Sequence, residues 1–178
     1  ARQTGVGRRL HSGTPPAALP ADAQEALRVL ATRDPFVRHC GIEFVEGGAG
    51  HATVRMRVEH RHINFNGSCH GGAIFTLADT AFGLAANGRG KIAVGIDTHV
   101  TFQRAAQLGQ TLVARSIEVS RSRRLAVYRV DVCVGGERAV QLQPPVSGGR
   151  LGREGRHLHQ VAQQRAVQRR QGQAERVK

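Results

Sequence analysis

One carboxylate stands out among the residues whose side chains could take part in chemistry. Asp79 lies in the middle of the most apolar stretch of the chain, between Ala78 and Thr80. Placing a carboxylate among apolar side chains costs free energy unless the group is paired or needed for function. The structural alternative is an aspartate that hydrogen-bonds to Thr76 or Thr80, or that faces solvent. We interpret Asp79 as a functional group, because apolar residues flank it on both sides.

Two glycines precede Asp79 at the expected start of the same helix. The N–H groups in the first turn of a helix have no acceptor within the helix, and they carry the positive end of its dipole. Because glycine has no side chain, a ligand can approach the backbone of Gly71 and Gly72 closely. Such a backbone suits a polarised carbonyl or an oxyanion.

Other reactive side chains form weaker patterns. Cys69 and His70 have the types of a nucleophile and its base, but neighbouring residues in a loop seldom point at each other, which favours an ordinary buried or partly exposed thiol. The pair His60 and His62, taken with His70, lacks the helical spacing or the carboxylate partner of a metal site. We therefore expect neither a metal nor a cofactor.

The charge of the chain is concentrated at its ends. The formal net charge is +13 over 178 residues, of which 4% are aromatic. Residues 1–20 contribute +3 and residues 141–178 contribute +6, whereas residues 21–140 hold 15 basic and 11 acidic side chains. This distribution predicts a field that attracts anionic ligands, and it argues against a nucleic-acid-binding face.

The compartment is inferred from cysteine usage and hydropathy. The three cysteines form no CxxC pair, and no stretch has the length and apolarity of a membrane-spanning helix. Residues 1–20 contain arginines but no apolar block, unlike a secretory signal. We expect a cytoplasmic protein that has no membrane partner.

Hydrophobic periodicity predicts two helices and five strands. The helices are expected at about 22–31 and 71–86, and the strands at 41–46, 52–58, 94–102, 112–119 and 128–134. The apolar pattern changes phase between Ala114 and Ile117, which predicts a β-bulge. The second helix is apolar around almost its whole circumference, so we expect it to be buried on nearly all sides. An antiparallel β-sheet wrapped around a central α-helix, of the α+β class, is the economical arrangement.

Three regions are expected along the chain. Residues 1–20 are interpreted as a disordered lead, residues 21–141 as the folded domain and residues 142–178 as a basic, disordered tail. The boundary rests on Pro144 and Pro145, because proline is not expected in a central strand. Deletion of residues 145–178 is therefore expected to leave the fold intact.

Three segments resemble the phenylacetate-degradation (PaaI-like) family of acyl-CoA thioesterases. The longest runs from His70 to Phe82, and the others cover residues 101–104 and 126–132. The resemblance implies the hotdog fold and hydrolysis of acyl-CoA to the free acid and coenzyme A. It also implies an aryl-acetyl substrate such as phenylacetyl-CoA or hydroxylated phenylacetyl-CoA. One departure is the segment after Ala139-Val140, where family members continue an apolar strand and this chain has glutamines and prolines.

The resemblance also implies roles for single residues. Asp79 would act as nucleophile or as the base that activates water, and the N–H of Gly71, with His70 beside it, would polarise the thioester carbonyl. Asn64 would orient the carbonyl or the water. Family sites lie between subunits, so a homo-oligomer is expected, either a dimer or a dimer of dimers (a homotetramer).

Four basic residues are candidates for binding the phosphates of coenzyme A. Arg123 and Arg124 lie in the turn between the last two predicted strands, and Arg89 and Lys91 follow the central helix. A solvated turn explains the arginine pair equally well.

Two other functions remain open at this point. A hotdog hydratase or dehydratase acts on the same thioesters but needs a catalytic histidine with an acid, for which His70 is the candidate. A non-catalytic acyl-CoA-binding sensor would bind the thioester without turnover.

Overall fold

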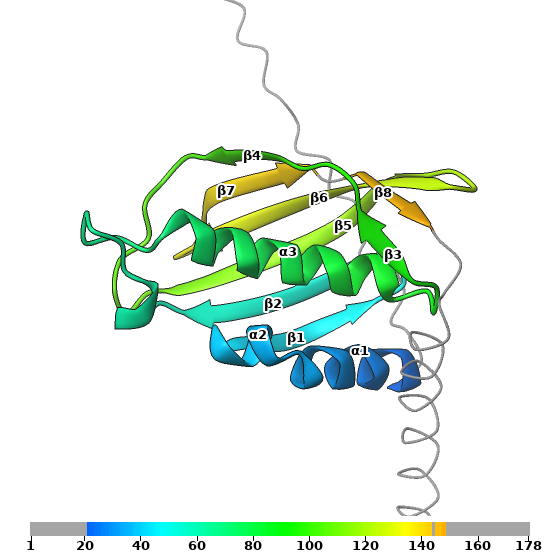
Figure 1. The fold of residues 1–178 in the computed structure, drawn as a ribbon, viewed down its shortest axis with the longest axis horizontal. Helices are drawn as coiled ribbons and strands as arrows, with labels where there is room; N and C mark the ends of the chain where they lie inside the picture. The colour runs from blue at the N-terminus through cyan, green and yellow to red at the C-terminus, as the bar shows by residue number, and fades with distance from the viewer. Residues whose placement is uncertain (1–20, 144, 149–178) are drawn as a thin grey trace, which may run out of the picture.

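A 17-residue helix, α3 (Gly71–Asn87), lies across the concave face of a curved antiparallel sheet in the computed structural model (Figure 1). The structure describes residues 21–143 and 145–148. The strands are β1 (Ile42–Gly48), β2 (His51–Arg57), β3 (Ala93–Gly95), β4 (His99–Phe102), β5 (Thr111–Arg121), β6 (Leu125–Val134), β7 (Glu137–Gln143) and β8 (Pro145–Gly148). The predicted α+β fold, with a sheet wrapped around a central helix, is confirmed.

The sheet follows the order β1-β2-β5-β6-β7-β4, and β8 pairs with both β3 and β6. Its core face is set by alternation along each strand. In β2 the side chains of Ala52, Val54 and Met56 are buried, whereas Arg55 and Arg57 on the other face are exposed. The alternation on which the prediction of this strand was based holds for these five residues, whereas Thr53, expected on the same face as the arginines, is buried.

The β-bulge predicted between Ala114 and Ile117 in strand β5 is wrong in position. In β5 the inward face continues from Leu112 through Ala114 to the buried Ser116, while Ile117 and Val119 are exposed on the outer face. The bulge lies further along, between Glu118 and Ser120. Hydrophobicity misled the prediction here because the outer face of the strand carries apolar residues and the inner face a serine.

The expectation that the central helix is buried on nearly all sides is wrong for the single chain, because one stripe of it is open. One face packs against β2, β5 and β6 and buries the large side chains of Ile74, Leu77 and Phe82. The opposite stripe, which includes Phe75 and Asp79, remains open in the single chain. The sheet therefore leaves the stripe with Phe75 and Asp79 uncovered.

Three helical segments flank the sheet. They are α1 (Ala21–Arg33), α2 (Pro35–His39) and the short 3-10 helix η1 (His60–His62). Helix α2 was not predicted from the sequence, although its start has a clear signal. Asp34 caps it by accepting hydrogen bonds from the N–H groups of Phe36 (2.8 Å) and Val37 (3.1 Å), and Pro35 occupies the first helical position. No helix in the described ranges is both long and apolar enough to span a membrane.

The sheet extends beyond the domain boundary predicted at residue 141. Strand β7 runs to Gln143, and β8 continues along the same edge of β6 in unchanged register, with Leu142 facing Val130 and Pro145 facing Val127. Proline is tolerated at the first residue of a strand, where one missing N–H interrupts the ladder without ending it. The expected lead at 1–20 lies outside the described residues, as do residues 144 and 149–178 of the tail expected at 142–178.

We therefore expect that deleting residues 145–178 destabilises the domain, in contrast to the expectation from sequence alone. A chain that ends at Gly148 retains the ladders from β8 to β3 and β6, whereas one that ends at Pro144 loses both. The shorter chain should melt about 5 °C or more below the longer one, which corresponds to roughly 2 kcal/mol. Thermal unfolding of the two truncations side by side measures the difference, and equal melting temperatures would contradict a structural role for β8.

Candidate active site

A cavity of about 520 Å³ opens along the uncovered stripe of α3. Its walls come from α1, α2, α3 and the segment that follows α3. Most of the lining is apolar, including Leu30, Phe36, Val37, Phe75, Leu84 and Ile92. The only carboxylates among the lining residues are those of Asp34 and Asp79, and Asp34 is engaged in capping α2.

Asp79 lies on the cavity side of α3 without a hydrogen-bond or ion-pair partner in the described part of the chain. The two threonines that might have satisfied it do not, because the Thr76 hydroxyl donates to the Gly72 carbonyl (2.9 Å) and the Thr80 hydroxyl to the Thr76 carbonyl (2.8 Å). The alternative of a threonine-paired aspartate is therefore wrong, whereas the alternative of an aspartate that faces solvent holds in the single chain, because Asp79 is exposed on the cavity side.

The environment of Asp79 changes its acidity. The carboxyl reaches solvent through the mouth of the cavity, but the surrounding walls remove much of its water. This desolvation disfavours the charged form and raises the pKa of Asp79 above its ordinary value of 3.8. A carboxylate with a raised pKa is a stronger base than an ordinary aspartate.

At its N-terminus α3 offers one free backbone N–H donor within the described structure. His70 caps the helix: its Nδ1 accepts from the Gly72 N–H (2.8 Å), and its carbonyl accepts from the N–H groups of Ala73 (3.0 Å) and Ile74 (3.2 Å). The Gly71 N–H has no acceptor among the described residues. It is therefore available to a ligand at the positive end of the helix dipole.

The neighbouring side chains have roles that the geometry limits. Because Nδ1 of His70 accepts a hydrogen bond, the proton of the neutral ring is assigned to Nε2. Cys69 is buried, and this burial raises the pKa of its thiol to about 11. A thiol with this pKa is almost fully protonated at neutral pH, so the Cys69–His70 pair does not form an activated nucleophile.

Asn64 organises the loop ahead of the helix. Its Oδ1 accepts from the N–H groups of Asn66 (2.9 Å) and Ser68 (3.2 Å), and its Nδ2 donates to the Ser68 hydroxyl (3.3 Å). The side chain is thus engaged within its own loop. This loop presents Phe65 at its tip with 96% of its surface exposed.

Within one chain, the Gly71 N–H and the Asp79 carboxylate cannot reach the same carbonyl group. They lie eight residues apart on one straight helix. At a rise of 1.5 Å per residue, this spacing separates them by about 12 Å along the axis. One chain therefore does not bring both groups to the same thioester carbonyl.

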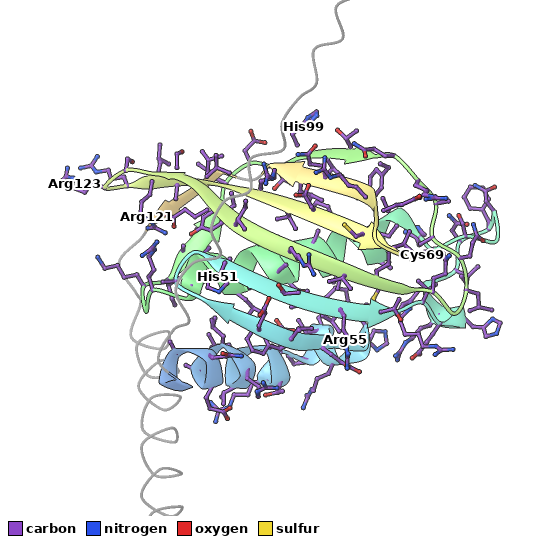
Figure 2. The ribbon with its side chains drawn as sticks, turned by 180° about the vertical axis from the view of Figure 1, so that it is seen from behind. His51, Arg55, Cys69, His99, Arg121 and Arg123 are labelled. Atoms are coloured by element: carbon purple, nitrogen blue, oxygen red, sulfur yellow. The ribbon has the colours of Figure 1, made fainter. Side chains whose placement is uncertain are left out.

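The four basic candidates lie in different surroundings. Lys91 lines the cavity, whereas Arg89 is ion-paired with Glu118 (3.3 Å). Arg123 and Arg124 lie in the turn between β5 and β6, and Figure 2 shows Arg123 at the tip of this hairpin, beyond Arg121. The structure therefore brings Lys91, but neither hairpin arginine, to the wall that holds Asp79.

Two parts of the site were not found from the sequence. The cavity wall formed by Phe36 and Val37 depends on α2, for which Asp34-Pro35 was the available signal. The second is the ion pair between Glu118 and Arg89, just before the cavity residues 90–92. No local pattern indicates it, because the two residues are distant in sequence. Among the described residues, no group of three or more histidine, cysteine, aspartate or glutamate side chains is arranged to hold a metal ion.

Comparison with known proteins agrees with this geometry. The profile of the Thioesterase superfamily matches residues 66–141. A putative esterase of Archaeoglobus fulgidus is 45% identical over 83 residues, which are 47% of this chain and 54% of that protein. The acyl-coenzyme A thioesterase PaaI of Escherichia coli is 33% identical over 109 residues, which are 61% of this chain and 78% of that protein.

A solved structure has the same fold. The structure of Escherichia coli PaaI, described as a protein of the phenylacetic acid degradation operon, superposes with a TM-score of 0.69 at 28% identity, covering 74% of this chain and 94% of that one. The aligned segment of the archaeal relative is little more than half of that protein's length. The helix with its glycine start and central aspartate, the wrapped sheet and these similarities together show that the chain belongs to the Thioesterase superfamily, as a PaaI-like hotdog thioesterase.

Proposed function

We propose that the protein hydrolyses acyl-CoA thioesters to the free acid and coenzyme A, with Asp79 as the catalytic base. The observation that carries this proposal is an unpaired carboxylate of raised pKa in an apolar cavity. The name of its relative PaaI, an acyl-coenzyme A thioesterase, supports the same reaction class.

The cavity favours an apolar acyl group of moderate size. A volume of about 520 Å³ is within the range of small-molecule sites. Two phenylalanines, Phe36 and Phe75, line it, and an aromatic ring packs well against other rings. We propose phenylacetyl-CoA or a hydroxylated phenylacetyl-CoA as substrate, consistent with the operon named for the Escherichia coli relative. Lys91 at the cavity is the first candidate for a phosphate contact, ahead of Arg89, Arg123 and Arg124.

The proposed reaction needs one base and one oxyanion donor. Asp79 removes a proton from water as the water oxygen attacks the thioester carbonyl carbon. The carbonyl oxygen becomes an oxyanion, which accepts a hydrogen bond from the Gly71 N–H. Collapse of the intermediate breaks the C–S bond, and the proton held by Asp79 passes to the departing thiolate.

The two groups would come from different subunits. The separation of about 12 Å between Gly71 and Asp79 along α3 leaves one chain unable to supply both. The edge formed by β3 and β4 also exposes Val94, Ile96 and Phe102, which is unusual for an edge strand facing water. We propose a homo-oligomer, a dimer or a dimer of dimers, in which Asn64 shapes the loop beside the shared site.

The two alternative functions are less well supported. A hydratase or dehydratase would need His70 paired with an acid, but its Nδ1 accepts the Gly72 N–H and no acid side chain contacts the ring among the described residues. An acyl-CoA sensor would bind the thioester but would not release the thiol, so steady turnover separates it from the enzyme.

Replacing Asp79 with asparagine should abolish most turnover and leave the fold intact. Asparagine has nearly the same shape but cannot accept the proton, and loss of a catalytic base costs orders of magnitude in rate. Thiol release from phenylacetyl-CoA, short-chain and long-chain acyl-CoAs measures the effect. Burial raises the pKa of Asp79 in the folded protein, so the ionised carboxylate destabilises the fold at pH values above the pKa of the unfolded state. The asparagine variant, which carries no charge, should therefore be at least as stable as the wild type at neutral pH. A folded variant with wild-type turnover would refute the role.

The pH dependence of turnover should reflect the cavity. Asp79 acts only when ionised, and desolvation raises its pKa, so kcat/KM should fall with decreasing pH through a midpoint above 3.8. The measurement is a pH profile of kcat/KM over the range in which circular dichroism shows the protein folded. An acid limb at or below the ordinary aspartate value would contradict the desolvated site.

Two inactive variants should restore each other's activity if the site is shared. Gly71→Pro deletes the N–H at the first helical position, where proline is tolerated, and the extended His70 (ψ 133°) suits a following proline. Gly71→Ala keeps the N–H and is the matched control, because the added methyl makes only ordinary contact with Phe102 at 3.4 Å. Gly71→Pro should be inactive and Gly71→Ala active.

Mixing Gly71→Pro and Asp79→Asn subunits should then recover activity, since a mixed dimer contains one site with both intact groups. Each variant alone, taken through the same unfolding and refolding, is the control. If mass spectrometry detects mixed oligomers but no activity is recovered, the shared site is refuted.

A further inference from the structure

A hydrogen-bonded cluster on the inner side of the sheet connects the strands to the segment after α3. Glu118 of β5, with 16% of its side chain exposed, accepts from the hydroxyl of the buried Tyr128 (3.0 Å), from Arg121 Nε (2.8 Å) and from Arg89 Nη2 (3.3 Å). Tyr128 in turn accepts from Arg121 Nη2 (2.9 Å) and packs edge-on against Phe82 of α3 (5.5 Å between ring centroids). One carboxylate therefore joins β5, β6 and the chain beyond the central helix.

The backbone around Glu118 is adapted to this cluster. The bulge between Glu118 and Ser120 adds a residue at this point of β5. The Glu118 N–H donates to the carbonyl of Gly50 (2.7 Å), whose φ of +85° is a conformation that favours glycine. A side chain at Gly50 would begin 3.2 Å from both Arg89 Nη2 and Glu118 Oε2, so glycine leaves room for the ion pair.

The charges of the cluster are mutually stabilising. Burial alone would raise the pKa of Glu118, but hydrogen bonds from Arg121, Tyr128 and Arg89 outweigh it and lower the pKa. Glu118 is therefore ionised at neutral pH. The hydrogen bond from Arg121 (2.8 Å) is of the stronger, charge-assisted kind, whereas the contact from Arg89 is longer (3.3 Å).

The segment tied by Arg89 forms one wall of the candidate active site. Gly90, Lys91 and Ile92 line the same cavity as Asp79. At its base the segment is closed by Asn87, whose Nδ2 donates to the Ala93 carbonyl (3.2 Å) and whose Oδ1 accepts from the Ala93 N–H (3.1 Å). We call residues 88–92 the wall loop. Apart from the Asn87–Ala93 hydrogen bonds, the Arg89–Glu118 ion pair is the side-chain contact that connects this loop to the sheet in the described structure. We call this ion pair the tie.

We propose that Glu118 is a positioning residue for substrate binding, which acts through Arg89 by holding the wall loop against the sheet. The inference rests on the proposed thioesterase function and goes beyond it by assigning a role to a residue that lies outside the cavity. A loop held in its binding conformation binds substrate without a further ordering cost, and this gain is lost when the tie is cut. The tie therefore sets KM more than it sets the chemical step.

Three single substitutions test the tie. Arg89→Gln and Glu118→Gln each remove it, whereas Arg121→Gln removes a neighbouring contact of Glu118 that does not reach the wall loop. The first two should raise KM by about threefold or more with a smaller change in kcat, and should speed hydrogen exchange of the amides at 88–93. The control Arg121→Gln should lower the melting temperature but leave KM and loop exchange as in the wild type.

The double variant Arg89→Gln/Glu118→Gln separates this role from direct substrate contact. If both residues act through one tie, the double variant has the KM of either single variant. If Arg89 binds coenzyme A directly, Glu118→Gln frees it and KM stays the same or falls, which would overturn the proposal. The Arg89 side chain is 42% exposed, so Arg89→Gln should fold even if Glu118→Gln does not. In that case hydrogen exchange at 88–93 in Arg89→Gln alone tests whether the ion pair holds the wall loop.

The readouts also separate this inference from the proposed function. Absence of thiol release from the wild type would show that the hydrolysis is wrong, and the assigned role in substrate binding would fall with it. Wild-type turnover combined with unchanged KM and unchanged loop exchange in Arg89→Gln and Glu118→Gln would overturn the positioning role alone. Equal effects of Arg121→Gln on KM would also overturn it, because they would mean a general loss of stability.

Discussion

The rigidity of α3 is the constraint on which the site depends. An α-helix fixes the distance between any two of its residues, and eight residues place the Gly71 N–H about 12 Å from Asp79. In the proposed reaction, the oxyanion donor at the helix start and the carboxylate at its middle therefore belong to two half-sites. The proposed reaction thus requires a second chain to complete each site, and the exposed apolar residues at the β3–β4 edge are consistent with such a partner.

The two faces of α3 divide stability from function. The face with Ile74, Leu77 and Phe82 packs on the sheet and contributes to the core, and each such side chain stabilises the fold by about 1.5–3 kcal/mol on burial. The opposite stripe holds Asp79 in a cavity where no described side chain compensates its charge. Desolvation raises the pKa of Asp79, so its ionised form at neutral pH reduces the stability of the fold.

Contacts outside the cavity connect its walls to the rest of the fold. Tyr128 contacts Phe82 on the core side and Glu118 through its hydroxyl, so one buried side chain connects the packing of α3 to the ion pair at Arg89. On the other side, the cap at Asp34 fixes α2, which supplies the second wall. Residues far from the carboxylate in sequence thus define the volume around it.

The sequence by itself determined the elements whose signals are local. The alternation in 52–58, the glycine start at Gly71 and the isolated Asp79 required only neighbouring residues, and the α+β arrangement followed from one helix too apolar for solvent. Only the tertiary structure decided which stripe of α3 is open, that β8 continues β7 beyond the prolines, and that Glu118 holds Arg89. These features depend on contacts between segments distant in the chain, and a local hydrophobic pattern contains no information about which partner covers a given face.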